Sequence, residues 1–154
     1  MTLFLYSVMT DAADHRALAA WWSAALDWEV GHADDGIAWA EHPDLPSQSL
    51  GVVPVPEPKT VKGRVHLDLR GADQAPEVER LLGLGARRAD VGQGPDVSWV
   101  VLADPEGNEF CVLEGPAPRP EVAVVAIDAV DPRRVAGFWA GALGTGWSTR
   151  TRAG

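Results

Sequence analysis

A strict alternation of apolar and polar residues marks residues 64–70 (RVHLDLR) as a β-strand. The apolar positions are Val65, Leu67 and Leu69. Successive side chains of a strand point to opposite faces, so the pattern predicts one buried face and one polar face. His66 and Asp68 share the polar face, about 6.6 Å apart along the strand at a rise of about 3.3 Å per residue.

A strand–helix unit occurs twice in the chain. Residues 11–26 (DAADHRALAAWWSAAL) and 128–143 (DAVDPRRVAGFWAGAL) are identical at eight of sixteen positions, and each follows a short β-prone run. In the second copy, Asp131 suits a helix N-cap and Pro132 the first helical turn, which predicts a helix ending before Gly144. Trp22 and Trp139 fall on matching helical faces, so we expect both to pack in a core.

A third, weaker copy lies between these two. After the strand at 64–70, Asp73 and Pro76 open a short helix that ends near Gly83. The turn DPEGN at 104–108 then joins two strands, which makes the unit β-α-β-β-β. The first unit is expected to match it, with strands at 3–9, 28–31, 37–41 and 49–55 and a helix at 14–26. Its last strand contains prolines, which favours an edge or a bulge.

These units define the expected domain organisation. One domain covers residues 1–115, with module one at 1–58 and module two at 62–115. A proline-rich linker occupies 116–120. Residues 121–154 form a partial strand–helix unit that is similar to the start of a further module.

Composition narrows the class of function. The 154 residues are 46% hydrophobic and 23% charged, with a formal net charge of −9, which is typical of a globular domain and unfavourable for nucleic acids or anionic membranes. The single cysteine, Cys111, excludes a disulfide within the chain. The apolar start MTLFLYSVM lacks a basic segment and a cleavage site, so we interpret it as a strand and expect a cytoplasmic protein.

The segments RVHLDLRGAD and LADPEGNEFCVLE, in two β-α-β-β-β units, resemble the vicinal oxygen chelate superfamily. Within it, the chain is similar to the glyoxalase-like and bleomycin-resistance-like proteins. The resemblance implies an α+β fold in which paired βαβββ modules form a cup-shaped mixed sheet around a small-molecule pocket, with the helices outside. Several chemistries use this scaffold, so fold alone does not define the function.

The resemblance also implies where a metal would bind, with one ligand on the first and one on the last strand of each module. His66, seven residues before Asp73, fills the first position of module two, and Cys111, seven after Asp104, fills the last. The corresponding place in module one is Phe4, and its last strand offers only Val52, Val53 and Val55. Two protein donors are too few for a tight site, so we expect no metal cofactor. If Ni, Zn, Mn or Fe binds, the expected ligands are His66 with Cys111 or Glu109.

Candidate ligand-binding residues combine aromatic rings with the polar strand face. The best candidate for catalysis is His66 with Asp68, because a carboxylate can orient an imidazole or tune its pKa. Structural alternatives remain open, since Trp39 and Trp99 would also suit packing under helices and Cys111 a small buried side chain. His15, His32 and His42 have no partners at metal-ligand spacing and are interpreted as surface residues. The ligand-binding set is Phe4, Tyr6, Trp39, His66, Asp68, Trp99 and Cys111.

Two classes of function follow. The first is a protein that binds or sequesters an apolar or aromatic small molecule without a complete metal site. The second is a metal-dependent lyase, isomerase or dioxygenase of the glyoxalase type, acting on a substrate with vicinal oxygens. The apolar stripe of residues 121–154 favours either docking on the same chain or a homodimer, because such a surface promotes association when exposed.

Overall fold

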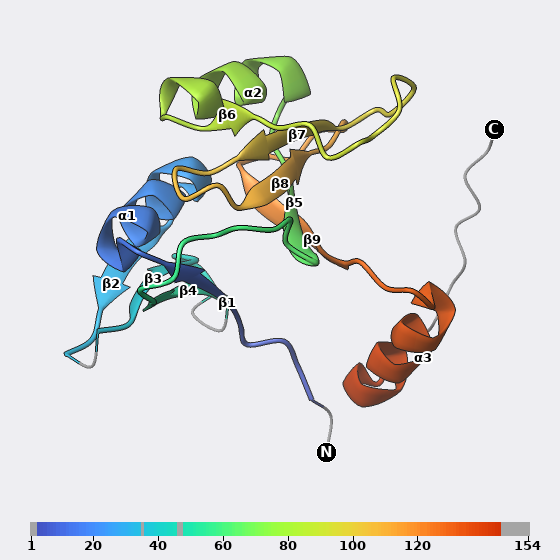
Figure 1. The fold of residues 1–154 in the computed structure, drawn as a ribbon, viewed down its shortest axis with the longest axis horizontal. Coiled ribbons are helices and arrows are strands. Elements are labelled where there is room, and N and C mark those ends of the chain that lie inside the picture. Colours follow the sequence, from blue (N-terminus) through green and yellow to red (C-terminus); the bar gives the residue numbers. More distant parts are fainter. Residues whose placement is uncertain (1–2, 35, 46–47, 146–154) are drawn as a thin grey trace.

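The computed structural model describes residues 3–34, 36–45 and 48–145 and folds them into two mixed β-sheets with three helices (Figure 1). This confirms the α+β class. The elements of module one are β1 (Ser7–Ala12), α1 (His15–Leu26), β2 (Glu29–His32), β3 (Ala38–Glu41) and β4 (Ser49–Pro54). Those of module two are β5 (Val65–Arg70), α2 (Gln74–Gly83), β6 (Arg87–Arg88), β7 (Val100–Ala103) and β8 (Glu109–Val112). They are followed by β9 (Glu121–Ile127) and α3 (Pro132–Leu143).

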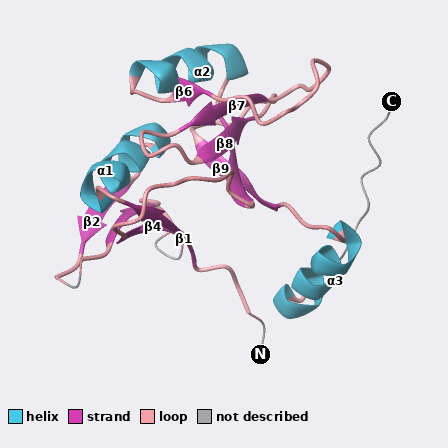
Figure 2. Cartoon of the chain, in the orientation of Figure 1, coloured by secondary structure: helices cyan, strands magenta, loops and turns pink. Residues whose placement is uncertain are grey.

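The two modules have the same strand order. The first sheet runs β1-β4-β3-β2, and the second runs β6-β7-β8-β5 with β9 added beside β5 (Figure 2). In each module the first strand pairs in parallel with the last, and the remaining pairs are antiparallel. The sequence repeat therefore corresponds to a repeat in topology.

Helix α1 forms as its sequence predicts. The side chain of Asp14 accepts a hydrogen bond from the Ala17 N–H, which satisfies a free donor of the first turn. The helix ends at Asp27, which adopts the left-handed conformation with φ 56°. Its apolar stripe lies on β3 and β4, and Trp22 is only 3% exposed. The expectation that Trp22 is a core residue is confirmed.

Helix α3 has the predicted ends but not the predicted packing. Asp131 accepts from the Arg134 N–H, and Gly144 takes a left-handed conformation at φ 64°. None of its described residues is buried, and Trp139 is 42% exposed, so the expectation of a core position is wrong for this tryptophan. Figure 1 shows α3 apart from both sheets. Helix α1 is covered by β3 and β4 of its own module, whereas the described part of the chain holds no strand after α3.

Two strands of module one differ from expectation. Residues 3–6 lie outside β1, which begins only at Ser7 and continues to Ala12. Strand β4 is internal rather than at an edge, because it pairs with β1 on one side and β3 on the other. Pro54 is its last residue, so the missing N–H of proline interrupts only the end of the strand.

Helix α1 of module one packs against module two. The Trp21 and Trp22 rings lie 5.9 and 5.2 Å from the ring of Phe110, on β8. Strand β5 takes β9 as its outer neighbour, in an antiparallel ladder with an irregularity between Asp68 and Leu69. Residues 121–127 therefore dock on the same chain. None of the described helices is long and apolar enough to cross a lipid bilayer.

Candidate functional site

Three potential metal-binding side chains converge on neighbouring strands of module two. His66 and Asp68 alternate on β5, and Asp68 lies in register with Cys111 on the parallel strand β8. The His66 Nδ1 atom is 2.9 Å from Asp68 Oδ1 and 3.9 Å from Cys111 Sγ. One donor atom from each residue lies within 4.8 Å of the others. The alternation thus places both β5 side chains where the sequence analysis expected them.

The short distance between His66 and Asp68 is not a regular hydrogen bond. Asp68 Oδ1 is buried and has no hydrogen-bond partner in the described structure, although the ring nitrogen lies 2.9 Å away. A buried carboxylate oxygen without a partner is costly. Nitrogen, oxygen and sulfur donors of one tetrahedral metal ion lie about 3.5 Å apart, since each bond measures about 2.0–2.3 Å. The residues therefore fit a metal ion in both chemistry and spacing.

Cys111 is a buried, protonated thiol. Burial, together with the negative charge of Asp68, raises its pKa to about 12. The thiolate is the reactive form of cysteine, so this side chain is a poor nucleophile at neutral pH. A metal ion that used this sulfur would have to displace its proton.

A hollow of about 440 Å³ opens over the three side chains. It takes its walls from β5, β7 and β8, from the loop around Gly92, and from the end of β9. None of the described residues that line this hollow belongs to module one. The family resemblance, by contrast, implies a pocket shared by two modules. The polar and aromatic lining residues are Lys62, His66, Asp68, Gln93, Trp99, Glu109, Phe110, Cys111 and Asp128.

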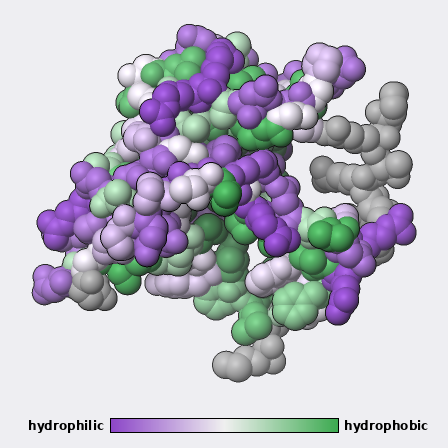
Figure 3. All heavy atoms as spheres, in the orientation of Figure 1, coloured by the Kyte–Doolittle hydropathy of each residue, from purple (hydrophilic) through white to green (hydrophobic). Residues whose placement is uncertain are grey.

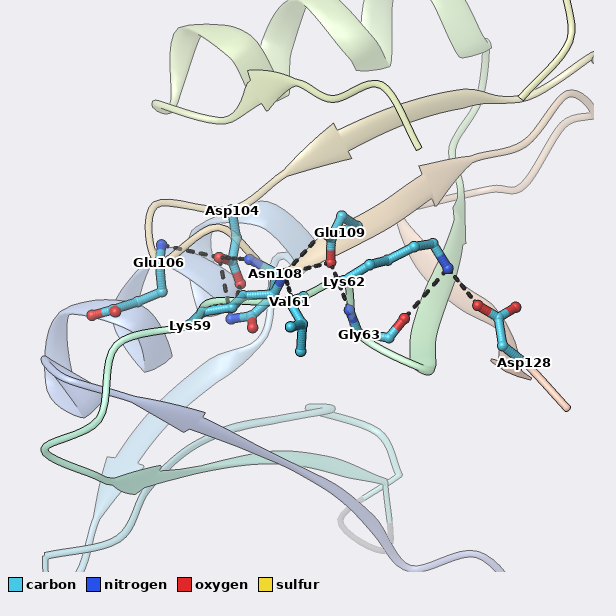
Figure 4. Close-up of polar contacts among 9 residues, drawn as sticks. All are labelled: Lys59, Val61, Lys62, Gly63, Asp104, Glu106, Asn108, Glu109 and Asp128. Carbon is cyan, nitrogen blue, oxygen red and sulfur yellow. Dashed lines mark hydrogen bonds and ion pairs between the residues drawn. The ribbon is translucent and has the colours of Figure 1, made fainter. Parts of the chain in front are cut away.

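The rim of the hollow is held by two ion pairs, drawn in Figure 4. Lys62 Nζ pairs with Asp128, and its hydrogen bond holds the pKa of Asp128 below the ordinary value. Lys59 Nζ lies 2.7 Å from Glu109 Oε2, and the Gly63 N–H donates to the same carboxylate at 3.1 Å. Burial opposes ionisation of Glu109, but these contacts hold its pKa below the ordinary value. Glu109 is thus used to hold residues 59–63. The carboxylate of the donor cluster is that of Asp68 rather than that of Glu109.

The other predicted site residues lie elsewhere. Phe4 and Tyr6 precede β1 and are exposed, and Tyr6 borders a separate cavity between β1 and β9. Trp39 lies on β3 against Gly31, where a Cβ atom would come within 2.5 Å of the indole ring. The structure therefore brings together His66, Asp68, Trp99 and Cys111, but not Phe4, Tyr6 or Trp39. The three further histidines are an exposed His32, a His15 with a buried Nε2, and a His42 that accepts from the N–H groups of its own loop.

The helix N-caps explain the position of Phe4. Each helix begins after an aspartate at the same place in its unit: Asp14, Asp73 and Asp131. The residues seven positions earlier are Ser7, His66 and Val124. Counting from Asp11 instead selected Phe4, three residues before the strand position that matches His66. The aspartate immediately before each helix was the signal that could have found Ser7.

Among the residues that the structure describes, the donor cluster occurs in module two alone. The counterpart of Asp68 is Met9 in β1 and Ala126 in β9. The register partner of Met9 is Gly51, where a Cβ atom would lie 2.4 Å from the Met9 sulfur. The place that Cys111 holds in module two is thus covered by a thioether side chain in module one.

Two βαβββ modules with a polar cluster on the first and last strands define a protein of the vicinal oxygen chelate superfamily. The family model described as a glyoxalase-like domain matches residues 7–113, and the chain belongs to this family. No curated protein sequence matches the chain.

Solved structures support the fold assignment at low sequence identity. A glyoxalase I mutant from Zea mays is 15% identical and has a TM-score of 0.67, with 91% of this chain covering 54% of that one. The fosfomycin resistance protein FosX from Listeria monocytogenes, complexed with Mn(II), is 13% identical with a TM-score of 0.58 (75% and 92% covered). A glyoxalase-related enzyme from Fulvimarina pelagi is 18% identical with a TM-score of 0.53 (80% and 96% covered).

Proposed function

We propose that the protein binds a small oxygen-bearing molecule in the hollow of module two, on a divalent metal ion held by His66, Asp68 and Cys111. The observation that carries this proposal is the convergence of nitrogen, oxygen and sulfur donors within 4.8 Å. The sequence analysis counted two donors, because it assigned Asp68 to orienting the imidazole. The parallel register of β5 and β8 supports a third.

The donor set favours zinc or a similar borderline ion. A sulfur ligand disfavours magnesium and calcium, whereas zinc accepts cysteine, histidine and carboxylate together. Three protein ligands leave at least one coordination position for a ligand, as in catalytic zinc sites. A bound ion would supply a positive charge that polarises the oxygen atoms of that ligand.

The remainder of the hollow sets the ligand class. Trp99 offers an aromatic wall, and Lys62 places a cation at the rim, although Asp128 already pairs with it. About 440 Å³ suits a molecule of one or two rings, because ligand pockets for drug-sized molecules span roughly 300–1,000 Å³. A flat molecule with two adjacent oxygens fits both the wall and the metal position.

Metal retention tests the first half of the proposal. The protein is incubated separately with Zn, Ni, Mn and Fe(II), desalted, and analysed by plasma mass spectrometry. We expect about one zinc ion per chain, with affinity reduced by more than about 100-fold in His66→Ala, Asp68→Asn and Cys111→Ser. His32→Ala is the matched control, because His32 is an exposed histidine of module one. Protein that retains no ion, or variants that retain as much as the wild type, would overturn it.

A second candidate is metal-free binding, in which His66 and Trp99 contact the ligand directly. The protonated state of Cys111 favours it, because a metal must overcome a thiol pKa of about 12. The neighbouring strand favours it as well, since β9 presents Val124 and Ala126 where further donors would be needed.

Catechol separates the two candidates, because it combines an aromatic ring with two adjacent oxygens. Its binding is measured by calorimetry on zinc-loaded and on chelator-treated protein. Binding only to the loaded protein supports the metal site. Equal binding to both, lost in His66→Ala and Trp99→Ala, supports the metal-free candidate. No binding to either form contradicts both.

A further inference from the structure

The connection between β6 and β7 is much longer than its counterpart in module one. It comprises eleven residues, 89–99, whereas the connection between β2 and β3 comprises five, 33–37. The other matching connections of the two modules differ in length by no more than two residues. The extension belongs to the module that holds the donor cluster. Its placement therefore favours a role at that site.

This β6–β7 loop forms one end of the hollow. Strand β7 runs antiparallel to β8, and β8 runs parallel to β5, so the loop lies at the end where β5 and β8 finish. Lys62, which precedes β5, lines the hollow at the opposite end. The loop contributes Val91, Gly92 and Gln93 to the wall. The donor cluster therefore lies between Lys62 and the loop.

The loop is folded by its own side chains. Asp90 Oδ1 accepts from the Gly92 N–H at 2.8 Å, and Gly92 has a left-handed φ of 79°, which glycine adopts without strain. Gln93 Oε1 accepts from the Val91 N–H at 3.0 Å. Figure 3 shows hydrophilic side chains over the outer tip of this loop, which is drawn in yellow in Figure 1. The two hydrogen bonds thus hold the turn that lines the hollow.

The bond to Val91 fixes the orientation of the Gln93 amide. A backbone N–H requires an acceptor, so the carbonyl oxygen of the side chain must face Val91. The Nε2 group then offers two donor hydrogens, and it has no hydrogen-bond partner among the residues that the structure describes. Gln93 is partly buried in the wall of the hollow. The group left to contact a molecule in the hollow is therefore a donor.

We propose that Gln93 Nε2 donates a hydrogen bond to an acceptor oxygen of the bound molecule, at the end away from His66 and Cys111. This role rests on the proposed function and narrows its ligand class. The ligand is an aromatic molecule with two adjacent oxygens at one end and a carbonyl or similar acceptor at the other. Leu113, at the loop end of the hollow, is about 6.6 Å beyond Cys111 at a rise of about 3.3 Å per residue. A ring with substituents at both ends spans a comparable distance.

The amide of Gln93 suits the selection of a neutral acceptor. A ligand without the acceptor leaves Nε2 unpaired and loses the energy of one hydrogen bond. A glutamate at this position would still accept from the Val91 N–H, but its second oxygen would be an acceptor with negative charge. Gln93→Glu therefore keeps the loop bond and reverses the group offered to the ligand. Gln93→Met removes both.

Two ligands of similar shape test the preference: 4-acetylcatechol, which carries a ketone acceptor, and 4-ethylcatechol, which lacks it. Calorimetry uses the form of the protein, zinc-loaded or chelator-treated, that binds catechol. We expect the ratio of the two affinities to shift against the ketone by about three- to tenfold in Gln93→Met, and at least as far in Gln93→Glu, as for one neutral hydrogen bond. The electronic effect of the ketone on the ring is the same in every protein and cancels. Gln48→Met, at an exposed glutamine of module one, is the matched control and should leave the ratio unchanged.

Two binding results would overturn this role of Gln93. Catechol binding with the same affinity ratio in Gln93→Met as in the wild type overturns it and leaves the proposed function standing. Absence of binding of all these catechols to either form overturns both. Hydrogen exchange followed by NMR tests the loop bond without a ligand: the Val91 N–H should exchange faster in Gln93→Met than in the wild type, and at about the wild-type rate in Gln93→Glu. Equal exchange rates in all three proteins would contradict the orientation of the amide.

Discussion

The indole Nε1–H of Trp22, on α1, donates a hydrogen bond of 3.2 Å to Asp104 Oδ2 in the turn between β7 and β8. Asp104 is completely buried, and its other oxygen accepts from the Glu106 and Asn108 N–H groups. Burial raises the pKa of Asp104, and hydrogen bonds from Asn108 and Trp22 offset part of that effect. This bond thus joins the helix of module one to the turn between β7 and β8 of module two.

Loss of this donor should weaken the junction between the modules. We expect Trp22→Phe to lower the free energy of unfolding by about 1–3 kcal/mol, because a buried acceptor loses its partner while most of the ring volume remains. Urea unfolding followed by far-ultraviolet circular dichroism measures the change. Trp139→Phe, the same substitution at an exposed and unpacked position, should cost less than about 0.5 kcal/mol. Equal effects of the two variants would contradict this role.

Arg80 should stabilise the same junction from α2. Its guanidinium donates to the Ala25 carbonyl at 2.6 Å and to the Ala24 carbonyl at 3.2 Å, at the end of α1, and pairs with Glu77. A cation near the last carbonyls of a helix is favourable. Arg80→Met keeps the apolar stem, so we expect a loss of about 1–2 kcal/mol in urea unfolding. The control is Arg88→Met, whose exposed ion pair to Glu79 spans 3.4 Å; a loss there as large as that of Arg80→Met would argue against the α1 contact.

The contacts of Glu109 should make stability depend on pH in the acid range. Its pKa is below the ordinary value of 4.5 in the folded protein, so its contribution is complete above that pH and is lost as the pH falls through the lowered pKa. Glu109→Gln should cost about 0.5–1 kcal/mol at pH 7, as expected for a partly exposed ion pair. The difference between variant and wild type should then shrink below pH 4.5. A stability difference between Glu109→Gln and the wild type that does not change with pH would contradict this role of Glu109. An equal difference for the exposed Glu79→Gln would contradict it as well.

Cys111 should resist alkylation in the folded protein. With its pKa raised to about 12, only about one thiol in ten thousand is ionised at pH 8. We expect iodoacetamide to leave the folded protein unmodified over hours and to modify it within minutes in guanidinium, as measured by intact-protein mass spectrometry. Asp68→Asn removes a nearby negative charge and should raise the rate. Rapid alkylation of the folded wild type would contradict a thiol that is both buried and protonated.

Local signals predicted the parts of the fold that depend on neighbours in sequence. The caps Asp14 and Asp131 and the repeated helix formed as expected, because each depends on contacts within a few residues. The alternation around His66 buries Leu67 and Leu69 as predicted, but Val65, at the start of β5, is 51% exposed. The predicted strand began at residue 3, but β1 begins at Ser7, because the extent of a strand is set by the strand that pairs with it. The partner of β1 is β4, about 40 residues away.

The candidate site was harder to predict because its donors come from two strands. His66 and Asp68 could be placed on one face from alternation alone. Adding Cys111 as the third donor required the register of β5 against β8, which a sequence does not display. Glu109 was the predicted alternative to Cys111 as a ligand, but it pairs with Lys59, which lies 50 residues earlier in the chain.

Lys62 and Asp128, which are far apart in the sequence, form an ion pair at the rim of the hollow. The rim is therefore built from two separate segments of the chain. Asp128 directly follows β9, so this part of the rim exists only while β9 is docked on β5. A molecule that contacts the rim therefore binds the docked chain better than the undocked one. By thermodynamic linkage, docking of β9 must then increase the affinity for that molecule by the same factor as the molecule favours docking.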